Sequence, residues 1–126
     1  MNFDEFQERI SHLLIRNTNI LDILTKCSLT SSKMCRSTVK SATGCGCIEI
    51  KGEKLPLDFD GDYKKLLKSS GINGRLCPDC RASVESEIGE MLFYMASLCN
   101  CLGLSLKDIM LQEVKRVESL GKYSLH

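Results

Sequence analysis

Apolar residues recur at spacings of three and four along most of this chain, which is the pattern of amphipathic helices. The first such segment covers residues 3–16. After a turn and capping cluster at residues 17–19, a second, longer segment runs to about Ser41. Because this segment is rich in Ser and Thr, its intrinsic helix propensity is low, and tertiary packing must supply most of its stability.

The strongest helical pattern follows Cys80 and stops at Gly103, which suits the position after a helix C-terminus. Ser105 then caps a last helix that ends at Gly121. We expect the apolar residues of this last helix to face the core: Leu106, Ile109, Met110, Val114 and Val117. The pattern therefore predicts an all-α fold, a helical bundle of about four main helices.

Residues 43–76 break the helical pattern with several glycines and an acidic turn at residues 58–62. Within them, residues 47–51 alternate like a short strand, and residues 63–68 could form one or two helical turns. A loop of this length in a compact domain needs an internal anchor. We interpret residues 43–80 as a Cys-rich, loop-rich insert in a single domain of residues 1–126.

The charge balance excludes some partners. Seventeen Lys and Arg residues against 16 Asp and Glu give a formal net charge of +1, which indicates neither a nucleic acid nor a membrane partner. No apolar run approaches the about 18 residues needed to cross a bilayer, and the acidic N-terminus lacks the features of a secretory signal. These features predict a cytoplasmic protein.

In a reducing compartment, closely spaced cysteines more often bind metal or do redox chemistry than form disulfides. Four of the eight cysteines form two tight pairs, one at Cys45 and Cys47 and the other at Cys77 and Cys80. Tetrahedral Zn²⁺ prefers four such thiolates, and these pairs bracket the insert where an anchor is needed. The spacing predicts a structural zinc site of these four residues, with iron as the alternative metal.

Other interpretations of the cysteines stay open. Unpaired cysteines are commonly buried in cores, and a Cys-x-x-Cys pair at a helix N-terminus, such as residues 77–80, can have redox activity. Cys27 and Cys99 lie in apolar stripes, so we expect both in the core. Cys35 could replace one of the four predicted ligands.

Glu87 and Glu90 place two carboxylates on one side of the third predicted helix. Spacing alone favours a solvated helix face, because Mg²⁺ sites of this type draw carboxylates from more than one element. However, the run EIGEMLFYMASLCN at residues 87–100, followed by LGLSLKDI at residues 102–109, resembles the MazG-like family of all-α nucleoside triphosphate pyrophosphohydrolases. The likeness covers roughly residues 84–120.

The resemblance implies Mg²⁺-dependent cleavage between the α and β phosphates of a nucleotide. It implies that Glu87 and Glu90 are catalytic and belong to the family's second acidic motif, with Glu in place of the usual Asp. It also implies that Lys115 and Arg116 approximate basic positions that contact the phosphates of the nucleotide.

Part of the family's pattern is missing. Its first acidic motif, an E-x-x-E on the preceding long helix, should fall within residues 20–40, but no carboxylate occurs at residues 24–46. Basic residues there would oppose Mg²⁺ binding. Lys33, Arg36 and Lys40 could instead contact phosphate without hydrolysis, or form a solvated basic face.

Two functional hypotheses follow. The first is a MazG-like nucleotide-handling protein that binds a nucleoside triphosphate or related phosphate ligand and hydrolyses it if Glu87 and Glu90 hold Mg²⁺. The alternative is a catalytically inactive zinc-binding interaction or regulatory module. Because helical bundles often complete their cores by dimerising, we expect a homodimer.

Overall fold

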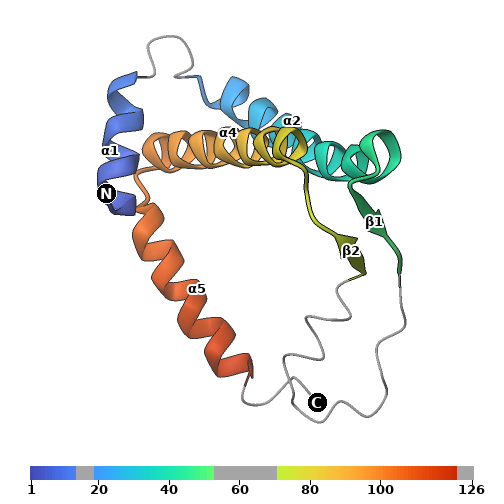
Figure 1. Ribbon diagram of the computed structural model, residues 1–126. Helices are drawn as coiled ribbons and strands as arrows, with labels where there is room; N and C mark the ends of the chain where they lie inside the picture. Colours follow the sequence, from blue (N-terminus) through green and yellow to red (C-terminus); the bar gives the residue numbers. More distant parts are fainter. Residues whose placement is uncertain (14–18, 53–70, 122–126) are drawn as a thin grey trace. The chain divides into compact units, whose positions relative to one another are not determined.

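The computed structural model describes residues 1–13, 19–52 and 71–121 (Figure 1). The elements in chain order are α1 (Phe3–Leu13), α2 (Ile20–Lys40), the π-helical turn η1 (Ser41–Cys45), β1 (Ile48–Ile50), β2 (Ile72–Gly74), α4 (Pro78–Leu102) and α5 (Leu106–Gly121). The predicted all-α class, with a loop-rich insert between the second and third main helices, is confirmed. The helical turns expected at residues 63–68 and the acidic turn at residues 58–62 lie outside the described residues.

The chain divides into two compact units, which we describe separately. The first unit comprises Met1–Ser32 and Ile88–His126, and the second comprises Lys33–Glu87. Helices α2 and α4 each contribute one part to each unit.

The core of the first unit is small and joins α1, α4 and the first turn of α5. Ile10, Ala96, Cys99 and Leu106 are buried there, and partly buried hydrophobic residues pack against them: Phe3, Phe6, Phe93 and Met95. The core position expected for Cys99 is confirmed. Cys27 is half-buried, and its thiol donates a hydrogen bond to the carbonyl oxygen of Tyr94 at 3.6 Å.

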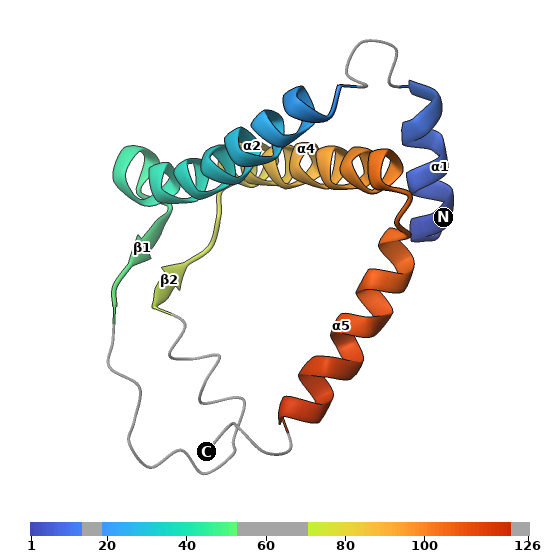
Figure 2. The same ribbon diagram turned by 180° about the vertical axis from the view of Figure 1, so that it is seen from behind.

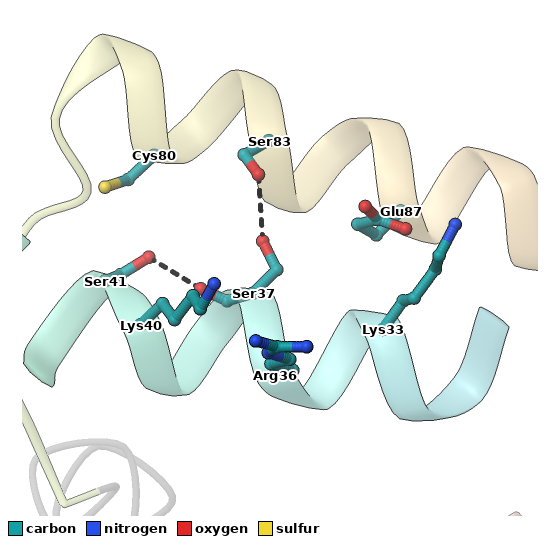
Figure 3. Close-up of a pocket in the computed structure, with 8 residues that line it drawn as sticks. All are labelled: Lys33, Arg36, Ser37, Lys40, Ser41, Cys80, Ser83 and Glu87. Atoms are coloured by element: carbon teal, nitrogen blue, oxygen red, sulfur yellow. Dashed lines mark hydrogen bonds between the residues drawn. The ribbon is translucent and has the colours of Figure 1, made fainter. Parts of the chain in front are cut away.

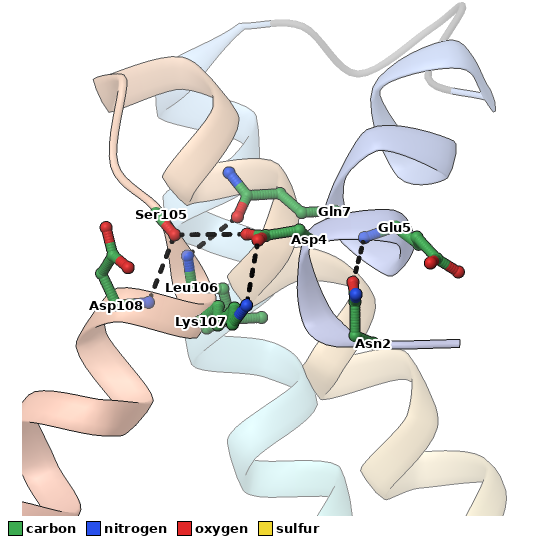
Figure 4. Close-up of polar contacts among 8 residues, drawn as sticks. All are labelled: Asn2, Asp4, Glu5, Gln7, Ser105, Leu106, Lys107 and Asp108. Atoms are coloured by element: carbon green, nitrogen blue, oxygen red, sulfur yellow. Dashed lines mark hydrogen bonds and ion pairs between the residues drawn. The ribbon is translucent and has the colours of Figure 1, made fainter.

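The connection between α4 and α5 follows the predicted capping residues. Gly103 adopts a left-handed conformation with φ of +67°, and the Leu104 N–H donates to the Cys99 carbonyl at 2.9 Å, which closes α4. The Ser105 hydroxyl accepts a hydrogen bond from the Asp108 N–H at 3.2 Å and so caps α5, as Figure 4 shows. Both helix boundaries were therefore predictable from the sequence.

The expected inward orientation of the apolar α5 residues is wrong after the first turn. Leu106 is buried, but the exposed fractions of Ile109, Met110, Val114 and Val117 lie between 37% and 53%. Because the chain bends by 106° between α4 and α5, only the start of α5 reaches the core at α1. The exposed residues form one wall of an apolar groove that also includes Phe3, Leu92 and Met95.

The second unit combines parts of α2 and α4 with a two-stranded sheet (Figure 2). The strand expected at residues 47–51 is confirmed as β1, and it pairs antiparallel with β2, with Ile48 opposite Gly74. The side chains of Ser37 on α2 and Ser83 on α4 share a hydrogen bond of 3.1 Å. This sheet and this helix pair position both predicted cysteine pairs.

Candidate metal centre

The first cysteine pair lies where α2 runs into η1. Gly46 ends this turn with φ of +81°, and its N–H donates to the Ser41 carbonyl at 2.9 Å. A residue with a Cβ atom rarely adopts this conformation, so glycine allows the sharp reversal between Cys45 and Cys47. This turn places both cysteines of the first pair at the end of η1.

The second pair lies at the N-terminus of α4, whose first residue is Pro78. Proline suits this position because a first-turn residue has no helical partner for an N–H. The Cys80 N–H donates to the Cys77 sulfur at 3.4 Å, so Cys77 caps the helix with its side chain. Cys80 follows one turn later.

The short sheet brings the two pairs together. Cys47 immediately precedes β1, and Gly74 ends β2 opposite Ile48. A Cβ atom on Gly74 would lie 2.7 Å from the Cys47 carbonyl oxygen, and Gly74 has φ of +93°. Only glycine permits this close approach of the two backbones.

The four cysteines converge as predicted. The sulfur atoms of Cys45, Cys47, Cys77 and Cys80 all lie within 4.8 Å of one another, and those of Cys45 and Cys77 are 3.8 Å apart. Zn–S bonds of about 2.3 Å in a regular tetrahedron place the sulfurs about 3.8 Å apart. The spacing is far from the roughly 2 Å of a disulfide. The donor set therefore fits one tetrahedral metal ion.

The close approach of the four thiols shifts the pKa values of Cys77 and Cys80 in opposite directions. Hydrogen bonds from Cys80, first from its backbone N–H, lower the pKa of Cys77 to about 7. At Cys80 the Ser41 hydroxyl lowers the pKa, but the neighbouring Cys77 thiol, burial and the other two thiols raise it to about 12. Four thiolates so close together need a cation to balance their charge.

Ser41 lies beside the cysteine cluster and was not predicted from the sequence. Its side chain is 2% exposed, its hydroxyl donates to the Ser37 carbonyl at 3.1 Å, and its carbonyl accepts from the Cys47 thiol at 3.6 Å. It thus contacts the centre through Cys47 and Cys80. The Cys47 contact needs the thiol hydrogen, which a metal-bound thiolate would not keep. Its position four residues before Cys45 was the one available signal.

Cys35 lies outside the cluster and is exposed, as is Cys101. The structure thus brings together the four predicted ligands without a replacement by Cys35. Cys77 and Cys80 do adopt the helix N-terminal arrangement of a redox pair, but two further thiols approach them. That environment is typical of a metal site more than of a dithiol that must exchange with a substrate.

Glu87 and Glu90, the two acidic residues for which the resemblance implies a catalytic role, are both half-buried on α4. The Oε2 atom of Glu87 is buried and has no hydrogen-bond partner. Glu87 lies in a pocket between α2 and α4 whose other charged lining residues are Lys33, Arg36 and Lys40. Among the described residues that line this pocket, Glu87 is the one carboxylate.

The two basic residues in the implied phosphate-contacting positions are exposed on α5. Arg116 donates through Nε to one oxygen of Glu113 at 3.1 Å and through a terminal nitrogen to the other. Lys115 lies beside it on the same helix. Glu113 therefore engages the guanidinium that the resemblance assigns to phosphate.

By length and hydropathy, no single helix in the described parts of the chain could cross a membrane; α4 and α5 meet these criteria only when joined across their bend. Because one fold can host many functions, function has to be inferred from the four sulfurs and the residues beside them. Comparisons with protein-family models, curated proteins and solved structures find no match to this chain.

Proposed function

We propose that this protein is a zinc-stapled binding module in which Cys45, Cys47, Cys77 and Cys80 hold one structural Zn²⁺ ion. The observation that carries this proposal is the mutual approach of four sulfurs within 4.8 Å. These sulfurs come from two backbone turns, each shaped by a residue suited to it, Gly46 and Pro78. Local sequence and long-range geometry agree on one centre.

A structural role follows from the number of ligands. Four protein thiolates complete a tetrahedral shell, whereas catalytic zinc keeps one position for water or substrate. The ion would join η1 to the N-terminus of α4 and hold β1 against β2. Neither strand exceeds three residues, and an isolated hairpin of this size is not stable in water. Zinc would therefore supply order that the sheet lacks by itself.

Metal analysis tests the zinc centre. Protein expressed without added zinc and purified without chelators should contain about one equivalent of zinc. Cys45→Ser and Cys80→Ser should each lose most of it, whereas Cys35→Ser should retain it, because Cys35 is exposed and outside the cluster. Replacement by Co²⁺ should give the visible absorption of a tetrahedral tetrathiolate. Folded wild-type protein without metal would refute the zinc centre, and iron in place of zinc would correct the metal.

Nucleotide hydrolysis is the second candidate function. The buried, unpartnered Oε2 of Glu87 favours it, because a carboxylate oxygen without a hydrogen bond is available to a cation or a ligand. The basic residues around it weaken the case for Mg²⁺, since like charges repel. Incubation with Mg²⁺ and a panel of nucleoside triphosphates decides the question. Pyrophosphate release that Glu87→Gln abolishes would establish the enzyme, and no release would leave the binding module.

The homodimer stays a prediction. The exposed apolar residues of α5 support it, because contiguous apolar surface on a helix commonly marks a protein contact. Light scattering of the zinc-loaded protein after size-exclusion chromatography measures its mass directly. Val114→Asp, in the middle of this surface, should convert a dimer to a monomer.

A further inference from the structure

The pocket between α2 and α4 gathers positive charge on one side of the second unit. On α2 it is lined by Lys33, Arg36, Ser37 and Lys40, and Ser41 at the start of η1 continues this helical spacing along one face. On α4 it is lined by Cys80, Ser83 and Glu87. Figure 3 shows these two rows of side chains along the facing sides of the helices. The pocket has a volume of about 340 Å³, enough for a small ligand.

The charges suit a doubly negative ligand. Three cations stand against one carboxylate, although the whole chain carries a net charge of only +1. Ser37 and Ser83 add hydroxyl groups that share a hydrogen bond of 3.1 Å. That bond uses the hydrogen of one hydroxyl, so the other hydroxyl can donate to a ligand. Charged and hydroxyl donors together are the groups that bind phosphate oxygens.

Glu87 restricts the anion further. Its buried Oε2 lacks a hydrogen-bond partner, and a carboxylate oxygen can only accept. An anion without hydrogen, such as sulfate, would repel it. A phosphate group that keeps one proton, or whose ester carries a neighbouring hydroxyl, can donate to it while its other oxygens meet the cations. The pocket thus favours an anion that is also a hydrogen-bond donor.

From this arrangement we infer that the pocket binds the phosphate group of a small ligand, hydrogen phosphate or a phosphate monoester, with Arg36 and Lys33 as cationic contacts and Glu87 as acceptor. This inference assigns a ligand class to the proposed binding module, and it rests on that proposed function because the pocket lies beside the proposed metal centre. It needs no hydrolysis. Phosphate binding and zinc content are separate measurements, so either can fail alone.

The cations of the pocket could instead serve to balance the negative charge of the zinc–thiolate centre. Zn²⁺ with four thiolates carries two net negative charges, and Cys80 belongs both to the cluster and to the pocket lining. Lys40 directly precedes η1, so it is the cation on α2 nearest in sequence to the metal ligands. Arg36 and Lys33 lie about one and about two helical turns earlier along α2, respectively. Substitutions at these two positions therefore separate ligand binding from support of the metal.

The test is calorimetric titration of zinc-loaded protein with inorganic phosphate, glycerol 3-phosphate and sulfate, in phosphate-free buffer of low ionic strength. Wild type should bind both phosphates at least about tenfold more tightly than sulfate, because sulfate leaves the buried Glu87 oxygen unpaired. Inorganic phosphate and glycerol 3-phosphate differ only in the attached glycerol group. The ratio of their dissociation constants therefore shows whether the pocket favours free phosphate or a phosphate monoester. Equal affinities for phosphate and sulfate would overturn the inference, as would the absence of binding at about 10 mM ligand.

Matched variants assign the residues. Glu87→Gln should bring phosphate and sulfate within about twofold of each other, because the amide can donate to either anion, whereas Glu85→Gln on the same helix should keep the preference. Arg36→Gln and Lys33→Gln should each weaken phosphate binding about tenfold with zinc content unchanged, and Arg9→Gln on α1 should change neither. Zinc loss in Arg36→Gln or Lys33→Gln would show that the cations serve the metal centre and would overturn the inference.

Discussion

The sulfur atoms of Cys45 and Cys77 lie 3.8 Å apart although 32 residues separate them along the chain. Closing a segment of this length costs conformational entropy, which some interaction at its two ends must offset. The neighbouring β1–β2 pair provides only short strands for this purpose. A metal ion shared by the four thiolates would supply such an interaction.

Chelation of zinc should therefore release the sheet before the helices. We expect amide exchange at Ile48–Ile50 and Ile72–Gly74 to accelerate at least about tenfold after zinc removal, because binding energy at such sites is folding energy. Far-UV circular dichroism should keep most of its helical signal. Amides of the buried Ala96 and Cys99 in α4 serve as the internal control. Unchanged exchange in the strands would mean that the sheet is stable without metal.

Gly74→Ala should weaken zinc binding without touching a ligand. The added Cβ would meet the Cys47 carbonyl oxygen at 2.7 Å, and alanine at φ of +93° is itself strained. Together these effects should cost about 1–3 kcal/mol in the free energy of unfolding and about tenfold in zinc affinity. Competition with a chromophoric chelator measures that affinity.

Gly44→Ala is the matched control, because a Cβ there has open space within 4 Å and Gly44 belongs to a helical turn. It should bind zinc like wild type. Equal zinc affinities for the Gly74→Ala and Gly44→Ala proteins would show that the close approach of Gly74 to Cys47 is relaxed in solution.

The helix boundaries and the clustering of the four cysteines were predictable because their signals are local. Gly103 and Ser105 mark the α4–α5 connection by their conformational and capping preferences. The two cysteine pairs each needed only a tight turn to present two sulfurs. In contrast, periodicity shows which residues share a helix face but not whether another element covers that face. The exposure of Val114 and Val117 could therefore not be read from the pattern.

Buried hydroxyl groups were missed for a different reason. Thr30, Ser41 and Ser97 are at most 2% exposed, yet they are polar residues within helices. Each hydroxyl donates to the carbonyl four residues earlier in its own helix, at 2.8–3.1 Å. The helix itself satisfies these groups, so their burial costs little. Hydropathy patterns count them as surface residues and thereby place the core incorrectly.

Gln7 connects α1 to the α4–α5 turn, and its loss should destabilise the first unit. Its amide nitrogen donates to the Leu104 carbonyl at 2.7 Å and to the Asn100 side chain at 2.9 Å, while its oxygen accepts from the Leu106 N–H at 2.8 Å. Gln7→Ala leaves these partners unpaired, so we expect a loss of about 1–3 kcal/mol in urea unfolding. Gln7→Glu should also destabilise, because a carboxylate cannot donate to Leu104 or Asn100.

The neighbouring Glu8→Ala provides the control for Gln7, because Glu8 is exposed and its carbonyl, not its side chain, accepts the hydrogen bond from Ser11. Its unfolding free energy should stay within about 0.5 kcal/mol of wild type. If Gln7→Ala were no more destabilising than Glu8→Ala, water would be replacing the Gln7 contacts without loss.

Arg116 and Glu113 allow a pH measurement that also tests the role implied for Arg116 by the MazG-like resemblance. The hydrogen bonds from Arg116 hold the pKa of Glu113 below its ordinary value. A carboxyl group with a lowered folded-state pKa adds stability above its unfolded pKa and loses that contribution as the pH falls through the folded pKa. The pair is exposed, so its effect on unfolding should be small.

Nuclear magnetic resonance titration of the Glu113 carboxyl measures the pKa of this group directly. Arg116→Gln should raise the pKa of Glu113 toward the ordinary value, and Lys115→Gln should leave it nearly unchanged, because Arg116 is the partner that lowers it. If phosphate drew Arg116 away from Glu113, saturating phosphate would raise the same pKa in the wild-type protein. We expect no such rise, because the inferred phosphate contacts are Lys33 and Arg36 on α2. A rise that Arg116→Gln abolishes would instead place the phosphate contact on α5.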